Sequence, residues 1–180
     1  MLRLRAVIAS ALNSGLVPAV FTFTMNGVHP ASKKGFVPLM SAEERVRGIE
    51  KLGVELEIVQ MDFDSVLLGV QSAKYDAGVS GITVTPARQK NMLFTKPYYN
   101  AAQVIVVKAD SAITGKADLA GKTVSVQTGT TAESGCDDAG INTMAFNANA
   151  DAKAALTTNK VDAWVVDNLT AAQMVEEGEG

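Results

Sequence analysis

The feature that most constrains the fold is a regular alternation of short apolar strands with helices, which runs from residue 54 to residue 176. Period-two patterns and brief apolar runs predict strands over 54–61, 77–80, 103–107, 123–127, 142–146 and 163–167. Helical spacing and capping signals predict helices over 63–72, from Pro86 onward, and over 116–120, 130–138, 150–158 and 168–176. Alternating strands and helices favour an α/β fold with mostly parallel sheets and flanking helices.

The pattern restarts near Asp110, which indicates two lobes. A chain of 180 residues is long enough for two small units, each with its own core. We expect the first lobe over 1–102, a crossing strand over 103–108 and the second lobe over 109–180.

The N-terminal third is less regular. Residues 2–9 predict a first strand, which we prefer to a shortened signal peptide because polar residues interrupt the apolar stretch at Asn13. On this interpretation the chain carries no visible export signal. A capping box at 41–44 predicts a helix over 42–52, and 21–27 resembles a strand that leads into a hairpin turn.

Composition and charge exclude several kinds of protein. The formal net charge is −3, from 16 basic and 19 acidic residues, and no basic stripe indicates nucleic-acid binding. No apolar run approaches the length of a membrane span. A single histidine, His29, and a single cysteine, Cys136, are too few for a structural zinc site or an internal disulfide. We therefore expect no metal and no cofactor, and we expect Cys136, beside Asp137 and Asp138, to be unreactive.

Polar residues follow three of the predicted strands at their carboxyl ends, where open α/β sheets bind ligands. The first segment, 80–88, has hydroxyl groups, backbone groups and a guanidinium. The second, 127–133, places backbone amides at the start of a helix, and the third ends in the carboxylate of Asp167. The candidate ligand-binding residues are Ser80, Gly81, Thr83 and Arg88, then Thr128, Gly129, Thr130 and Thr131, and finally Asp167.

These groups complement a zwitterion. Arg88 and the amides of 129–131 are suited to an α-carboxylate, and Asp167 with Ser80 and Thr83 is suited to an α-ammonium. Each charge-assisted bond contributes roughly 1.5–3 kcal/mol. Several together reach about 8 kcal/mol, which corresponds to about micromolar affinity.

Each residue also has an ordinary structural interpretation. Taken alone, Arg88 is better explained as a solvated helix residue, and Asp167 is equally suited to be the N-cap of the helix that follows it. The turn at Gly129 resembles many strand–helix joints, and it lacks the Gly-Lys-Ser/Thr ending of a Walker phosphate loop. We expect Trp164 to lie in the core.

Several segments resemble the family 3 extracellular solute-binding proteins, the receptors of amino-acid ABC importers. They include LGVELEIVQMDFDS from Leu52, QSAKYD from Gln71, GITVTPAR from Gly81, FTKPYY from Phe94, DLAGKTV from Asp118, QTGTT from Gln127, and KVDA from Lys160 with Asp167–Asn168. The resemblance implies a two-lobed, type II periplasmic-binding-protein-like fold. It also implies that Arg88, helped by Thr83 and Thr131, grips the ligand carboxylate, and that Ser80 and Asp167 meet the ammonium.

The resemblance further implies a monomeric receptor that closes around a free polar or small L-amino acid in the cleft between its lobes. Such a receptor delivers the ligand to a membrane permease and is periplasmic, or extracellular and membrane-associated. The absence of acidic residues from 10–21 makes lysine or arginine a less favoured ligand.

The sequence departs from the family at 16–21, where an aromatic-Pro-Pro-Phe loop is usual, and after Gly35-Phe36. It also stops at Gly180, so we expect a truncated chain whose first lobe lacks its closing segment. Two alternatives stay open: a cyclohexadienyl-dehydratase-like enzyme on the same fold, with Glu133 as its proton-transfer residue, and a sensory module of a larger receptor.

Overall fold

The computed structural model describes residues 2–9, 54–95, 97 and 100–176. The chain divides into two compact units, Met1–Tyr99 and Asn100–Gly180. The expected division into 1–102, 103–108 and 109–180 stays a prediction. The helix predicted over 42–52, the strand over 21–27 and His29 lie outside the described residues.

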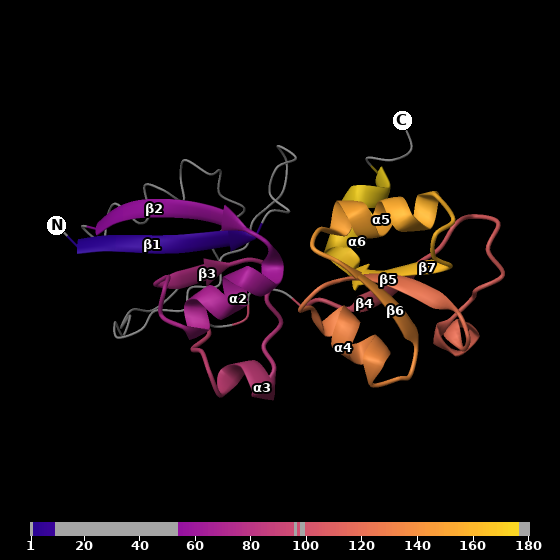
Figure 1. Cartoon of the computed structure of the whole chain (residues 1–180), viewed down its shortest axis with the longest axis horizontal. Helices are drawn as coiled ribbons and strands as arrows, with labels where there is room; N and C mark the ends of the chain where they lie inside the picture. Colours follow the sequence, from indigo (N-terminus) through magenta and orange to yellow (C-terminus); the bar gives the residue numbers. More distant parts are fainter. Residues whose placement is uncertain (1, 10–53, 96, 98–99, 177–180) are drawn as a thin grey trace. The chain divides into compact units, whose positions relative to one another are not determined.

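The first unit contains a parallel sheet of three strands in the order β2-β1-β3 (Figure 1). Its strands are β1 (Leu2–Ala9), β2 (Val54–Met61) and β3 (Ala77–Val79), and its helices are α2 (Phe63–Gln71) and α3 (Pro86–Gln89). The central strand β1 pairs with β2 along its whole length, from Leu2 opposite Val54 to Ala9 opposite Met61. The prediction of a strand over 2–9 is therefore confirmed.

Helix α2 supplies most of the described core of the first unit. Its residues Val66 and Val70 recur at a spacing of four and are buried, while Leu68, on the opposite side, is 61% exposed. The buried cluster comprises Phe63, Val66, Leu67, Val70, Tyr75, Ile82 and Met92. This packing fixes the segment after β3, because Ile82 and Met92 flank it on both sides.

Gly69 lies where α2 approaches the ring of Tyr75. A Cβ atom at this position would lie 2.5 Å from Tyr75 Cδ2, closer than any real contact. We expect Gly69→Ala to lower the free energy of unfolding by about 1–3 kcal/mol, the usual effect of overpacking. Gly135→Ala in α4 (Thr131–Asp137) is the control, because a Cβ there meets nothing within 4 Å. Urea titrations of both variants test this, and equal midpoints would contradict it.

The second unit contains a sheet of four strands in the order β4-β7-β5-β6 (Figure 1). Its strands are β4 (Gln103–Val106), β5 (Thr123–Gln127), β6 (Asn142–Phe146) and β7 (Ala163–Asp167). Its helices are η2 (Lys116–Leu119, a 3₁₀ helix), α4, α5 (Asn149–Thr157) and α6 (Asn168–Glu176). Strand β5 runs parallel to β6 and β7, whereas β4 runs antiparallel to β7.

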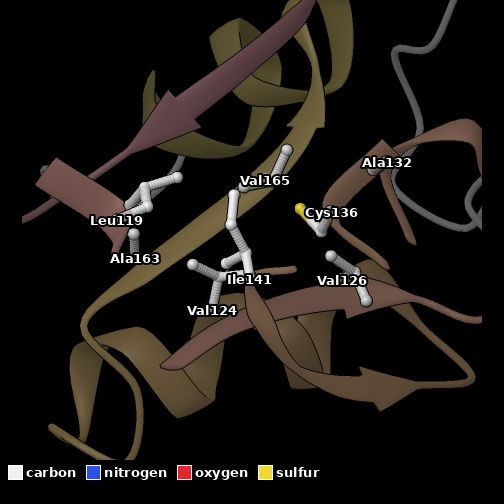
Figure 2. Close-up of a cluster of buried hydrophobic side chains, with 8 residues drawn as sticks. All are labelled: Leu119, Val124, Val126, Ala132, Cys136, Ile141, Ala163 and Val165. Carbon is white, nitrogen blue, oxygen red and sulfur yellow. The ribbon is translucent and has the colours of Figure 1, made fainter. Parts of the chain in front are cut away.

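Alternate residues of the central strands face two separate cores. Val124, Val126, Ala163 and Val165 pack with α4, and Figure 2 shows this cluster around Cys136. The intervening residues of β7, Trp164 and Val166, pack with α5 and α6 on the other face. Trp164 is 0% exposed, which confirms its predicted place in the core. Helices therefore cover both faces of this sheet (Figure 1).

Helix α5 meets its face of the sheet through small residues and polar bonds. Its buried residues are Ala152, Ala155 and Leu156. The hydroxyl of Ser125, which is fully buried, donates to the Ala152 carbonyl at 2.8 Å. At the carboxyl end of β5, Asn149 donates its side-chain amide to Gln127 Oε1 at 2.9 Å. Two polar contacts thus join α5 to one strand.

The elements predicted from residue 54 onward are present with almost the predicted bounds. Strands β2, β5, β6 and β7 and helix α6 begin and end as predicted. Several others differ by one residue at an end, as β3 and β4 do. The helix predicted over 116–120 is a short 3₁₀ helix.

Cys136 is a buried, free thiol, 4% exposed, on the inner side of α4 (Figure 2). Burial raises its pKa above the ordinary value, the negative charge of Asp137 raises it further, and Lys116 opposes the change. A raised pKa favours the neutral thiol, which agrees with the expectation that Cys136 is unreactive.

The Cys136 pKa predicts a pH dependence of stability. Because the folded state holds the thiol proton more tightly, this contribution is present below the unfolded thiol pKa, about 8.5. It is lost as the pH rises above that value.

Alkylation tests the burial of Cys136 itself. We expect iodoacetamide to label the native chain slowly at pH 8 and to label it at once in urea, as mass spectrometry would show. Equal rates in both states would contradict a buried thiol.

Candidate functional site

The first candidate segment follows β3 and leads into α3. The predicted cap is confirmed: the Thr85 hydroxyl accepts a hydrogen bond from the Arg88 amide at 3.2 Å, and Pro86 is the first helical residue. A tight turn precedes it, in which the Ile82 amide donates to the Ser80 carbonyl at 2.8 Å. The cap places Arg88 in the last turn of a short helix whose start is fixed.

The guanidinium of Arg88 is held on two sides. Its Nη1 donates to the Thr83 carbonyl at 2.9 Å, and its Cζ lies 5.7 Å from the centroid of the Phe63 ring. Phe63 is the buried first residue of α2, and Thr83 lies in the segment between β3 and α3. The guanidinium is thus orientated by local contacts, and its recognition of a ligand carboxylate stays a prediction.

The second candidate segment is the turn from β5 into α4. Gly129 has a φ of +77°, which glycine adopts without strain. Its amide donates to Glu133 Oε2 at 2.7 Å, while the Thr130 hydroxyl accepts from the Glu133 amide at 3.3 Å. These bonds form a variant of the capping box. A ligand carboxylate would have to displace Glu133 to reach the Gly129 amide, so this amide is a weaker anion donor than the sequence suggested.

The remaining amides of this turn are partly engaged as well. The Thr130 amide approaches the Gln127 carbonyl at 3.4 Å, and the Thr128 amide donates to the Phe146 carbonyl at 2.9 Å. The hydroxyl of Thr131 instead accepts from Gln103 Nε2 at 3.1 Å. Thr131 therefore links this turn to the start of β4, as Thr128 links it to the end of β6.

The third candidate, Asp167, is the last residue of β7. In the antiparallel register Gln103 lies opposite it, and Gln103 Nε2 donates to Asp167 Oδ1. The same nitrogen donates to Thr131, so one amide joins two predicted site residues that are 36 positions apart in the chain. Asp167 also immediately precedes α6, which is the position of an N-cap residue, so the alternative that it caps this helix stays open.

The structure thus gathers the candidates into two groups, one in each unit. Thr83 and Arg88 are in direct contact in the first unit, near Ser80, which is partly buried, and Gly81, which is exposed. Thr131 and Asp167 are joined in the second unit, where Thr128, Gly129 and Thr130 form the adjoining turn.

Two contacts were not predicted. Gln103 is the first residue of β4, and its role depends on the pairing of β4 with β7, which the sequence does not reveal. The contact of Glu133 with Gly129 had a signal, because Thr130-Thr131-Ala132-Glu133 has the spacing of a capping box. In the enzyme alternative Glu133 is the proton-transfer residue, whereas its observed contact is that of a helix cap.

The part of the chain that the structure describes has neither a cluster of metal ligands nor a membrane-spanning helix. In residues 2–9, 54–95, 97 and 100–176 no three His, Cys, Asp or Glu side chains gather where they would bind a metal ion. None of the helices in these ranges is long and apolar enough to cross a membrane.

Comparison with solved structures gives the class of the fold. The arginine-bound form of a truncated arginine-binding protein, ArgBP from T. maritima, is 32% identical and superimposes with a TM-score of 0.75, over 97% of this chain and 78% of that one. The fold is the two-lobed α/β fold of type II periplasmic binding proteins, as the sequence predicted.

Sequence comparison gives the family. Residues 47–177 match the model of the bacterial extracellular solute-binding proteins, family 3, and the chain belongs to this family. The arginine-binding extracellular protein ArtP of Bacillus subtilis is 35% identical over 68% of this chain and 49% of its own length. A probable histidine-binding protein of Campylobacter jejuni is 33% identical over 71% of this chain and 51% of its own. The chain thus spans about half the length of the curated relatives it matches.

Proposed function

We propose that this chain is the ligand-binding part of an extracytoplasmic receptor for a free L-amino acid. The observation that carries the proposal is that each unit, taken by itself, holds one charged group in a fixed orientation. Arg88 is held by Thr83 and Phe63 in the first unit, and Asp167 is held by Gln103 in the second. In this proposal the guanidinium of Arg88 is suited to an α-carboxylate, and the carboxylate of Asp167 is suited to an α-ammonium. Thr83, Thr131 and Ser80 add hydrogen bonds.

The names of the relatives support a narrower choice of amino-acid ligand. Those compared above are named for arginine and histidine. Both amino acids have a nitrogen-rich, polar side chain, so we propose a polar amino acid with arginine and histidine as the first candidates. This choice goes against the weak signal from residues 10–21, where no acidic residue is present to pair with a cationic side chain.

The wider role follows from the family. We propose that the receptor acts as a monomer outside the cytoplasmic membrane, in the periplasm or at the outer cell surface, and delivers its ligand to the permease of an ABC importer. Family membership supports this role.

An enzyme on the same fold is the competing proposal. It needs a group that transfers a proton in the site. Glu133, the residue considered for this, accepts the Gly129 amide as part of a helix cap, and the relatives compared here are named as binding proteins. A turnover assay with prephenate and arogenate separates the two proposals, and we expect no product above background.

Isothermal titration calorimetry of the 180-residue chain against the twenty L-amino acids tests the proposed function. We expect heat with one amino acid or a few chemically similar ones, at about micromolar affinity. Thermal melting serves as a second measurement, because ligand at 100 times its Kd adds about 2.7 kcal/mol to the free energy of unfolding. A folded chain that gives neither heat nor a melting shift with any amino acid would overturn the proposal.

A further inference from the structure

Gln103 lies at the centre of the candidate site in the second unit, although its side chain is exposed. It is the first residue of β4 and is directly opposite Asp167 in the antiparallel register with β7. Residues directly opposite in such a ladder extend their side chains from the same face of the sheet. The register therefore places the Gln103 amide next to the Asp167 carboxylate.

The side-chain amide of Gln103 donates hydrogen bonds to two predicted ligand-binding residues. Its Nε2 donates to Asp167 Oδ1 and, at 3.1 Å, to Thr131 Oγ1. An amide nitrogen has two hydrogens, so these two bonds use its full donor capacity. An exposed glutamine gains little burial from this arrangement, which means that the contacts orientate its partners rather than fill a core.

The backbone on both sides of this pair is fixed independently. The Asn168 amide donates to the Ala102 carbonyl at 2.9 Å, and the Ala102 amide donates to Asn168 Oδ1 at 3.1 Å. The start of β4 is therefore fastened to the start of α6. Because the backbone does not depend on the Gln103 side chain, replacement of that side chain should change the orientation of Asp167 and leave the fold in place.

We propose that Gln103 is a positioning residue of the amino-acid site, which holds Asp167 and Thr131 in the orientation that binds the ligand. The inference rests on the proposed function. A neutral donor is suited to this role, since lysine or arginine would neutralise the carboxylate and so weaken its attraction for an ammonium group. A carboxylate has about four acceptor sites, so one bond from Gln103 fixes its orientation without exhausting its capacity.

The test compares Gln103→Met with Gln103→Glu by calorimetry, using whichever amino acid gives the strongest heat with the wild-type chain. Methionine keeps the length of the side chain and removes both donors. We expect Gln103→Met to weaken binding by about tenfold or more, the effect of losing a hydrogen bond to a charged group. Gln60→Met is the matched control, because Gln60 is an exposed glutamine on β2, and its affinity should equal that of the wild type.

Gln103→Glu supplies a readout that a purely structural role would not change. At pH 7 the new carboxylate faces Asp167, and like charges at this distance weaken the site. As the pH falls toward 5 a proton shared by the two carboxylates restores the bridging bond. We expect the affinity of Gln103→Glu, relative to the wild type at the same pH, to recover over this interval, and that of Gln103→Met to stay low.

The outcomes separate the two proposals. If the wild-type chain binds an amino acid and Gln103→Met binds it within twofold, the positioning role is overturned and the proposed function stands. If Gln103→Met weakens binding but its melting temperature falls by many degrees, a role in folding replaces the positioning role. If the folded wild-type chain binds no amino acid, the proposed function fails and the inference fails with it.

Discussion

Replacement of Arg88 by alanine is expected to weaken binding of the cognate amino acid by about 100- to 1000-fold. Truncation of one partner of a bound charge pair costs about 2–5 kcal/mol, because the other charge is left without its counterion. The guanidinium that is lost is one whose position is fixed by the Thr83 carbonyl at 2.9 Å and by the Phe63 ring. Titration calorimetry measures the effect, with competition by a tighter ligand if direct heats vanish.

Two further variants distinguish recognition from general loss of charge. Arg88→Lys keeps the positive charge but not the planar fork that matches a carboxylate, so we expect an intermediate affinity. Gln89→Ala changes the adjacent, exposed residue of α3 and serves as the control. Binding that survives both Arg88→Ala and Asp167→Ala would exclude the zwitterion site.

The largest effect on stability is expected from Trp164→Ala. Trp164, the second residue of β7, is 0% exposed and packs in the core that α5 and α6 share with the sheet. Loss of a buried large side chain costs about 3–5 kcal/mol, from lost transfer free energy and from the cavity that remains. That is a large part of the total stability of an ordinary domain, about 5–15 kcal/mol.

Two comparisons make the Trp164 prediction specific. Trp164→Phe keeps most of the volume and removes an indole Nε1 that is buried and has no acceptor in the described part of the chain, so a much smaller loss is expected. Leu169→Ala in α6 is the control, because Leu169 is 52% exposed. Urea unfolding followed by circular dichroism measures all three. A midpoint for Trp164→Ala equal to that for Leu169→Ala would contradict this account.

The sequence predicted the elements well because their signals are local. Strands β5 and β7 are short apolar runs with turn residues beside them, and the cap at Thr85 is predicted from the dipeptide Thr85-Pro86. The candidate residues Arg88, Thr131 and Asp167 were predicted in the same way, from their positions after strands. Their contacts within each unit are now known, and their roles in ligand binding stay predictions.

Contacts that depend on pairing between distant segments were not predictable. The role of Gln103 follows from the antiparallel register of β4 with β7, a relation between residues 64 positions apart that neither periodicity nor composition encodes. The amide of Gly129 was expected to face a ligand, yet Glu133 accepts its hydrogen bond. The spacing of Thr130 and Glu133 is that of a capping box, which predicts this contact. The same turn also resembles an anion site at a helix start, and the two patterns predict different partners for the amide.

The small buried face of α5 has a consequence for the uniqueness of the fold. Apart from Leu156, the buried side chains of α5 are the small ones of Ala152 and Ala155, so hydrophobic burial alone constrains the register of helix and sheet less than a row of large side chains would. The bonds from Ser125 to the Ala152 carbonyl and from Asn149 to Gln127 can form in one register alone. These polar groups therefore select a single alignment of helix and strand, and their removal should broaden the native ensemble more than it lowers the melting temperature.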